Sequence, residues 1–198
     1  MRADAKKNYE QLLEVARAVF TEQGADASLR DVARRAGVGL GTLYRHFPTR
    51  ETLLEALLRE GFEALTARAK QLETSSASDD ALVIWIRETI AFTHSHQGVI
   101  TPMVAAIEDP NSALHASCVA LKSAGAALLA RARADGKAAS DINGTDLFAL
   151  IAALAWLREQ PSHAPRADHL FDVIVNRVLR KTGCANISSG RARKTDSG

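Results

Sequence analysis

The sequence predicts an all-α fold, with a small N-terminal three-helix unit and a larger helical C-terminal domain. Apolar residues recur at helical spacing along almost the whole chain, strand-like alternation is nearly absent, and Gly and Pro lie mostly at segment borders. The chain has 198 residues, 46% of them hydrophobic, which is enough to bury a sizeable core. We therefore expect helices over nearly the full length.

The first two predicted helices have recognisable ends. The first runs from about Ala5 to Gln23, where Gly24 closes it. Its apolar face consists of Leu12, Val15, Ala16, Val19 and Phe20. The second begins after Ser28, a residue type that caps helix N-termini, and Asp31 three residues later has the spacing of a capping box. We expect this second helix to end near Ala36.

A glycine turn joins the second helix to a third. Gly37 can adopt the positive φ of a helix C-terminus, and Ala33 is small enough for two helices to cross closely. The third helix, about Leu40 to Phe47, buries Leu43 and Phe47 on one face and leaves its other faces exposed. This pattern predicts a helix-turn-helix whose second helix fits a DNA major groove.

The exposed faces of the third helix carry groups suited to DNA. Donors for phosphate oxygens are supplied by Thr42, Tyr44, His46 and Arg50. Gly41 lets the backbone approach the duplex, and Leu40, which has no polar atom, is suited to contact a thymine methyl group. Helix-turn-helix shapes also occur in proteins that do not bind DNA, and in that case Tyr44 and Phe47 belong to the core.

Over residues 9–60 the sequence resembles the TetR family of bacterial transcriptional regulators. The resemblance is carried by GVGLGTLYRHFPTRETLL and, before it, by LLEVARAVFTEQGADASLRDVARRAGV. It implies that bases are approached by Arg30, Leu40, Gly41 and Tyr44, and that phosphates lie along Thr42, Arg45, His46 and Arg50. Leu40 and Gly41 are less polar than their counterparts in some members, which leaves open which bases are read.

Charge distribution agrees with a DNA-binding N-terminus more than net charge does. The formal net charge is only +2, but residues 1–47 hold eight Lys or Arg against six acids, whereas residues 48–181 hold fourteen against sixteen. Arg2, Lys6 and Lys7 fit phosphate contacts by a flexible arm, and they equally fit a solvated helix start.

The rest of the chain divides into a connecting helix, an effector and dimerisation domain, and a tail. We expect the DNA-binding unit at residues 1–49, the connecting helix at 50–72, the C-terminal domain at 73–182 and a disordered basic tail at 183–198. Helices of the C-terminal domain are predicted at about 81–95, 97–108, 112–135, 144–159 and 166–182.

Several side chains of the C-terminal domain are candidates for lining an effector cavity. They are Trp85, Thr89, Phe92, Met103, His115, Cys118 and Lys122. Each has another interpretation, because large apolar residues at helical spacing are typical of a core, and His115 and Lys122 are also typical of a solvated helix face. The sequence leaves these alternatives open.

The last two helices are more apolar than one core-facing stripe requires. We expect them to form a four-helix bundle with a second copy of the chain. The interface is predicted at Leu147, Ile151, Leu154, Phe171, Ile174 and Val178. The alternative is an internal helix hairpin, but the TetR resemblance favours dimerisation, since members of that family dimerise through their last two helices. A dimer implies a palindromic operator.

Other chemistries have little support in the sequence. His94 and His96 are two residues apart and so point in different directions on a helix, which disfavours a metal site. Nucleophile-elbow, zinc-protease, P-loop and dinucleotide motifs are lacking, so we expect neither an enzyme nor a cofactor. Cys118 and Cys184, the charged N-terminus and the shortness of the most apolar run, Leu147 to Leu157, favour a cytoplasmic protein without a membrane segment.

The sequence thus favours a homodimeric regulator, a repressor that leaves a palindromic operator when a small-molecule effector binds. The alternative is a DNA-binding protein without a small ligand, either architectural or controlled by a protein partner. A helical enzyme with a vestigial DNA-binding motif is a third hypothesis, for which no titratable cluster has convincing spacing.

Overall fold

The computed structural model describes residues 2–24 and 26–179, and it confirms the all-α prediction. The α-helices are α1 (Arg2–Gln23), α2 (Leu29–Arg35), α3 (Leu40–His46), α4 (Arg50–Ser75), α5 (Ser78–Ser95), α6 (Gln97–Ile100), α7 (Val104–Glu108), α8 (Ala113–Ala134), α9 (Gly144–Glu159) and α10 (Ala167–Val178). Two 3₁₀ turns, η1 (Thr101–Met103) and η2 (Ala164–Arg166), complete the set. Over the described residues, β-structure is limited to an isolated antiparallel bridge between Ala138 and Leu179.

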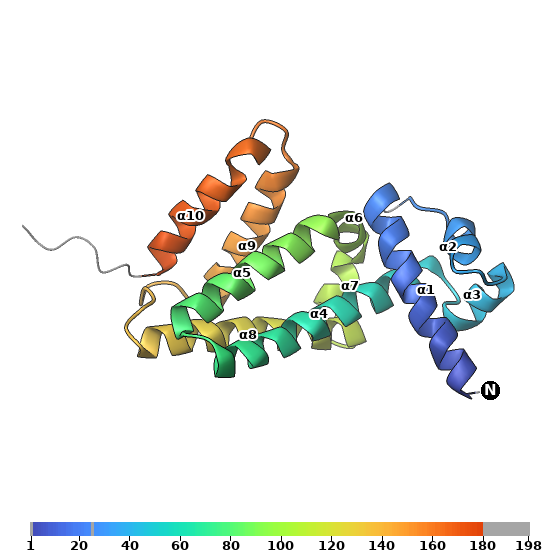
Figure 1. The fold of residues 1–198 in the computed structure, drawn as a ribbon, viewed down its shortest axis with the longest axis horizontal. Helices are drawn as coiled ribbons and strands as arrows, with labels where there is room; N and C mark the ends of the chain where they lie inside the picture. The colour runs from blue at the N-terminus through green and yellow to red at the C-terminus, as the bar shows by residue number, and fades with distance from the viewer. Residues whose placement is uncertain (1, 25, 180–198) are drawn as a thin grey trace, which may run out of the picture.

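Helices α1 to α3 gather at one end of the molecule, and α9 and α10 project together at the other (Figure 1). The long helix α4 runs from the first group into the C-terminal domain, beside α5 and α8. It packs on α1 near its start and on α5 and α8 farther along. A single helix therefore connects the N-terminal unit to the C-terminal domain. Its last turn, to Ser75, extends beyond the end expected at Leu72.

The helix-turn-helix has the predicted turn but lacks the predicted cap. Gly37 adopts φ +67°, and its amide and that of Val38 donate to carbonyl oxygens at the end of α2, at 3.2 and 3.0 Å. Ser28 precedes α2 in an extended conformation, but its side chain makes no capping hydrogen bond. The capping-box prediction for Ser28 and Asp31 is therefore wrong, because the Asp31 carboxylate bonds to neighbouring side chains instead.

The predicted helix over residues 97–108 is broken into α6, η1 and α7. Pro102 lies at the start of the 3₁₀ turn, and a proline ring cannot donate the backbone hydrogen bond that a continuous helix needs there. The chain consequently bends between α6 and α7. Both short helices belong to the wall of a cavity described below.

Close packing in the C-terminal domain centres on Trp85 of α5. The indole is fully buried, and its Nε1 donates to the Leu65 carbonyl oxygen of α4 at 2.9 Å. Gly125 of α8 permits this position, since a Cβ there would lie 2.4 Å from the indole ring. Phe148 of α9 packs edge-on against the same ring. One side chain thus holds α4, α5, α8 and α9 together.

Helix α8 is the one described helix that is long and apolar enough to span a membrane by length and composition. It packs most extensively on α4 and also on α5 and α9. Buried core helices of soluble proteins have the same composition. The predicted final helix ends at Val178, whereas its expected last turn, Cys184 and the tail at 183–198 lie outside the described residues.

Candidate nucleic-acid interface and effector cavity

Helix α3 is anchored on one face and free on the others. Leu43 is fully buried and Phe47 nearly so, as predicted. Tyr44 is 44% exposed, Leu40 is half-buried, and a Cβ added at Gly41 would meet no atom within 4 Å. Helix α3 is therefore fixed to the N-terminal unit by one face and open to solvent on the others.

Arg45 and His46 are held in place by neighbours on the same unit. The Arg45 guanidinium donates to Thr42 Oγ1 at 2.9 Å and to the Gly41 carbonyl oxygen at 3.3 Å, while its side chain stays exposed. The His46 ring lies edge-on to Tyr9 of α1, with 6.1 Å between centroids. Arg30 is exposed on the first turn of α2. Arg30 and Arg45 are therefore exposed, whereas His46 is half-buried.

Arg50 differs from its predicted placement. Its Nη1 donates to the Ala27 carbonyl oxygen at 2.8 Å, and the guanidinium carbon lies 5.2 Å from the centre of the Phe20 ring. A cation over an aromatic face and a buried carbonyl acceptor both favour this inward position. Arg50 therefore braces the loop before α2 rather than extending along the outer surface as expected.

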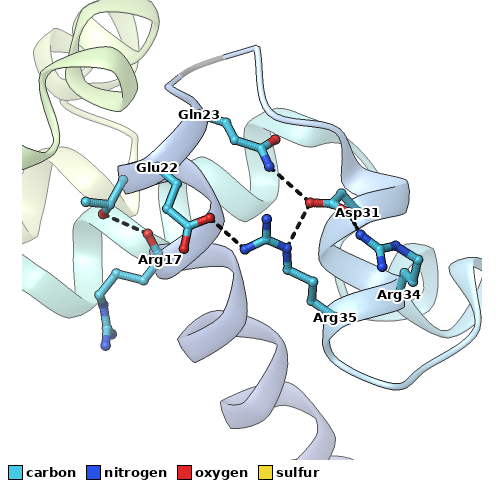
Figure 2. A network of polar contacts seen from close by, with 7 residues as sticks. Arg17, Glu22, Gln23, Asp31, Arg34 and Arg35 are labelled. Carbon is cyan, nitrogen blue, oxygen red and sulfur yellow. Dashed lines mark hydrogen bonds and ion pairs between the residues drawn. The ribbon is translucent and has the colours of Figure 1, made fainter.

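A polar network that the sequence did not reveal fixes α2 against α1 (Figure 2). The Asp31 carboxylate accepts from Arg34 and from Gln23 Nε2, and it pairs with Arg35 at 3.0 Å. Arg35 reaches back to Glu22 of α1 at 2.7 Å. Hydrogen bonds from Arg34 and Gln23 lower the pKa of Asp31, so it stays ionised at neutral pH. The network fastens α2 to the end of α1.

A cavity of about 450 Å³ lies in the C-terminal domain. Its walls come from α4 to α9 and are mostly apolar. The lining residues are Phe62, Thr89, Phe92, Thr93, Ile100, Val104, Ile107, Cys118, Leu121, Lys122, Thr145, Phe148, Ala149, Ile151 and Ala152. This volume and lining are typical of small-molecule sites.

Four of the seven predicted cavity residues line this cavity: Thr89, Phe92, Cys118 and Lys122. Trp85 and Met103 are buried in the core, which corresponds to the alternative left open for them. His115 is half-buried, and its Nδ1 lies 2.8 Å from the Ile107 carbonyl oxygen, so it fastens α8 to α7. The sequence did not predict the cavity wall formed by α6 and α7, because it predicted one continuous helix there and not the break at Pro102.

Phe92 connects the cavity to the connecting helix. It packs edge-on against Phe62 and stacks on His96 with 4.1 Å between ring centroids. A Cβ added to Gly61 of α4 would lie 2.1 Å from the Phe92 ring. Burial, reinforced by the positive charge of Arg17, lowers the pKa of His96. Phe92 therefore lies between the cavity and Gly61 of the connecting helix α4.

The predicted dimer residues mostly face inward. Leu147, Ile151, Leu154, Phe171 and Val178 are each at least 97% buried by the chain itself, and only Ile174 is half-buried. The free apolar surface of this helix pair instead includes Trp156 and Val173, both 51% exposed, with the exposed Ala149, Ala152 and Ala153. Because α9 is apolar on nearly all sides, the sequence alone does not say which side its own domain covers, and the interface residues stay a prediction.

Cysteine and histidine chemistry adds little to either site. Cys118 is buried, and desolvation raises the pKa of its thiol, which disfavours the reactive thiolate. His94 is exposed, whereas His96 Nδ1 donates to the Phe92 carbonyl oxygen at 2.9 Å and the His96 ring stacks on the Phe92 ring. Within residues 2–24 and 26–179, no three His, Cys, Asp or Glu side chains gather as metal ligands.

Comparison with known proteins identifies the family. Residues 12–57 match the profile of bacterial regulatory proteins of the tetR family, and residues 77–177 match that of the SbtR-like transcriptional regulator C-terminal domain. The chain belongs to the TetR family. This is a family of transcriptional regulators and not of enzymes, and the resemblance noted in the helix-turn-helix is thereby confirmed.

Solved TetR-family structures resemble most of the chain. The TetR regulator SCO0520 of Streptomyces coelicolor is 34% identical with a TM-score of 0.70, covering 86% of this chain and 98% of its own. A TetR regulator of Mycobacterium vanbaalenii is 26% identical with a TM-score of 0.64, covering 90% and 98%. The HTH-type regulator SAR2658 of Staphylococcus aureus is 28% identical over 50% of this chain and 55% of its own length, so the chain spans about half of that curated relative.

Proposed function

We propose that this protein is a homodimeric, DNA-binding repressor that is released from a palindromic operator when a small molecule occupies the C-terminal cavity. The exposed surface of α3 is the observation that carries the DNA-binding part. Its buried face is anchored by Leu43, and its exposed side carries Tyr44 and Arg45, which is the arrangement expected of a recognition helix in the major groove. The proposed site of action is the cytoplasm, where the operator DNA is.

In the proposed complex, bases are approached by Arg30, Leu40, Gly41 and the ring of Tyr44. Phosphates lie along Thr42, Arg45 and His46, and the Tyr44 hydroxyl also donates to a phosphate oxygen. Leu40 is half-buried and apolar, so it contributes a contact to a thymine methyl group and no hydrogen bond. Arg50 is left out of the phosphate contacts because its guanidinium is occupied by Ala27 and Phe20. Its role in this proposal is to hold the helix-turn-helix in shape.

The dimer is proposed to form through the exposed apolar surface of α9 and α10. Trp156 and Val173 are two of five large apolar side chains that are exposed among the described residues. Apolar surface of this kind is stabilised by burial against a copy of itself related by a two-fold axis. Two recognition helices separated by about one turn of DNA, roughly 34 Å, would then read a palindrome.

Effector response is proposed to pass through Phe92. A ligand in the cavity contacts this ring, and the ring lies directly over Gly61 of α4. Arg17 of α1 and Glu60 of α4 form an ion pair at 2.9 Å beside the same position, so movement of α4 is carried to the DNA-binding unit. The effector must bind one of two conformations more tightly for this to shift DNA affinity.

Selection of bound sequences from a random duplex library, at fixed salt, tests the proposal. We expect a palindromic sequence to be enriched, and compounds that enter the cavity to release it. A palindrome that no compound releases would favour control by a protein partner. Failure to enrich any sequence would overturn the DNA-binding proposal.

A further inference from the structure

The cavity of the C-terminal domain has an apolar end and a polar end. Ile100, Val104 and Ile107 of the α6–α7 segment supply apolar side chains, as do Phe62 and Phe92. Two of its hydroxyls are already used, since Thr89 donates to the Trp85 carbonyl oxygen and Thr93 to that of Thr89, each within α5. This part of the cavity therefore offers a ligand mainly apolar contact, and neither hydroxyl has a free hydrogen to donate.

Lys122 and Thr145 lie where the cavity meets a second, more polar hollow. That hollow is lined by Lys122, Ser123, Ala126, Asn143, Gly144, Thr145 and Phe148, so the two spaces share Lys122, Thr145 and Phe148. Lys122 is exposed, and no ion pair engages it among the described residues. A flexible ammonium group is thus available at one end of an otherwise apolar space.

The charges of the lining are of one sign. Neither space has an Asp or Glu among its lining residues, and Lys122 is the charged residue common to both. A positive group without a neutralising carboxylate favours a negatively charged ligand group and disfavours a cationic one. Apolar walls favour an alkyl or similar hydrophobic portion.

We infer that the effector is an amphipathic anion, with its hydrophobic tail between α5, α7 and α9 and its carboxylate or phosphate group at Lys122. The inference rests on the proposed effector cavity and adds the chemical class of its ligand. The tail contacts Phe92, which connects the cavity to α4. The anionic group fixes the orientation of the ligand at the far end, beside Thr145.

Calorimetric titration of the purified full-length protein, with DNA absent, tests this inference directly. The probes are decanoate, decyl phosphate, decanol and decylammonium, which share one tail and differ in the head group. Lys122→Gln should weaken decanoate and decyl phosphate by roughly tenfold, as expected for loss of one favourable charge interaction, and leave decanol nearly unchanged. Preference between the two anions distinguishes a carboxylate from a phosphate ligand.

Lys70→Gln is the matched control, since Lys70 is also an exposed lysine but lines a groove between α4 and α8 instead. It should leave all four affinities unchanged. The inference is overturned if decylammonium binds as tightly as decanoate, if Lys122→Gln affects decanol and decanoate equally, or if none of the four binds. DNA binding is measured separately, so loss of operator recognition would contradict the proposed function without altering the calorimetric result.

Discussion

Tyr44 lies on an exposed part of α3, where its hydroxyl can reach a phosphate oxygen of a bound duplex. Tyr44→Phe should weaken operator binding by about 0.5 to 1.5 kcal/mol, the contribution of an ordinary hydrogen bond, without changing the preferred sequence. Fluorescence anisotropy with the selected duplex measures the loss. An altered preferred sequence in a repeated selection would contradict the phosphate role and assign Tyr44 to base reading.

His96 gives the fold a predictable dependence on pH. Burial lowers its pKa below the ordinary value of 6.5, so the unfolded chain binds the extra proton first as pH falls. The contribution of His96 to the free energy of unfolding should be constant above about pH 6.5 and decline below it. The lowered pKa values of Asp31, Glu51 and Asp79 act below about pH 4.5, outside this window.

Thermal unfolding at about pH 7.5 and about pH 5.5 measures this effect. The fall in Tm should be smaller for His96→Gln than for the wild type. His94→Gln is the control, because His94 lies two residues earlier, in the last turn of α5, and is exposed. Equal pH dependence in the wild type and His96→Gln would show that His96 is not the responsible group.

Gly61 is the point at which α4 accommodates the Phe92 ring. Gly61→Ala would place a methyl group 2.1 Å from that ring, so Phe92 must move. We expect a loss of about 1 to 3 kcal/mol in unfolding free energy, which is typical of overpacking, together with a weaker effector response. Denaturant unfolding measures the first effect and ligand-induced DNA release the second.

Gly41→Ala is a control for the stability part of this prediction. The added methyl group would meet nothing within 4 Å, and alanine favours a helix interior by about 0.5 to 1 kcal/mol relative to glycine. Stability should therefore rise slightly. If Gly61→Ala left both stability and effector response unchanged, Phe92 would not couple the cavity to α4.

At the level of helices, the sequence predicted what is encoded locally. The glycine turn at Gly37 and the buried pair Leu43 and Phe47 follow from spacing alone, and so do most helix borders. The inward position of Arg50 could not be predicted, because Phe20 and Ala27 are brought to it only by the tertiary fold. The Asp31 contact with Gln23 of α1 also depends on the tertiary fold, whereas its ion pairs with Arg34 and Arg35 lie within α2.

The cavity, too, has features that follow from local sequence and features that depend on the tertiary fold. Thr89, Phe92, Cys118 and Lys122 were predicted because helical spacing on α5 and α8 aligns them. Trp85 has a similar pattern, yet the fold buries it against Leu65 and Gly125. Periodicity identifies the faces of a helix, but packing decides which face borders the core and which borders a cavity.

At the scale of the whole molecule, a substitution at Trp156 tests whether the protein is a dimer or a monomer. Trp156→Glu places a charge on the exposed apolar surface of α9 and should give folded monomers with poor operator affinity. Sedimentation velocity measures the association state, and circular dichroism checks the fold. Leu154→Glu would serve less well, because Leu154 is buried and a charge there would unfold the chain.

Val119→Glu is the matched control for the dimer surface, because Val119 is a similarly exposed apolar side chain on α8, away from the α9–α10 pair in sequence. It should leave the dimer intact. If the Trp156→Glu protein still sediments as a dimer, the interface lies elsewhere on the molecule.

The stoichiometry of the protein on its selected duplex tests the central claim most directly. Sedimentation of the labelled palindrome with increasing protein should show one dimer bound per duplex, and a duplex that carries a single half-site should bind much more weakly at the same salt concentration. One monomer bound per half-site, with equal affinity for the half-site and the palindrome, would contradict a repressor that reads DNA as a two-fold symmetric dimer.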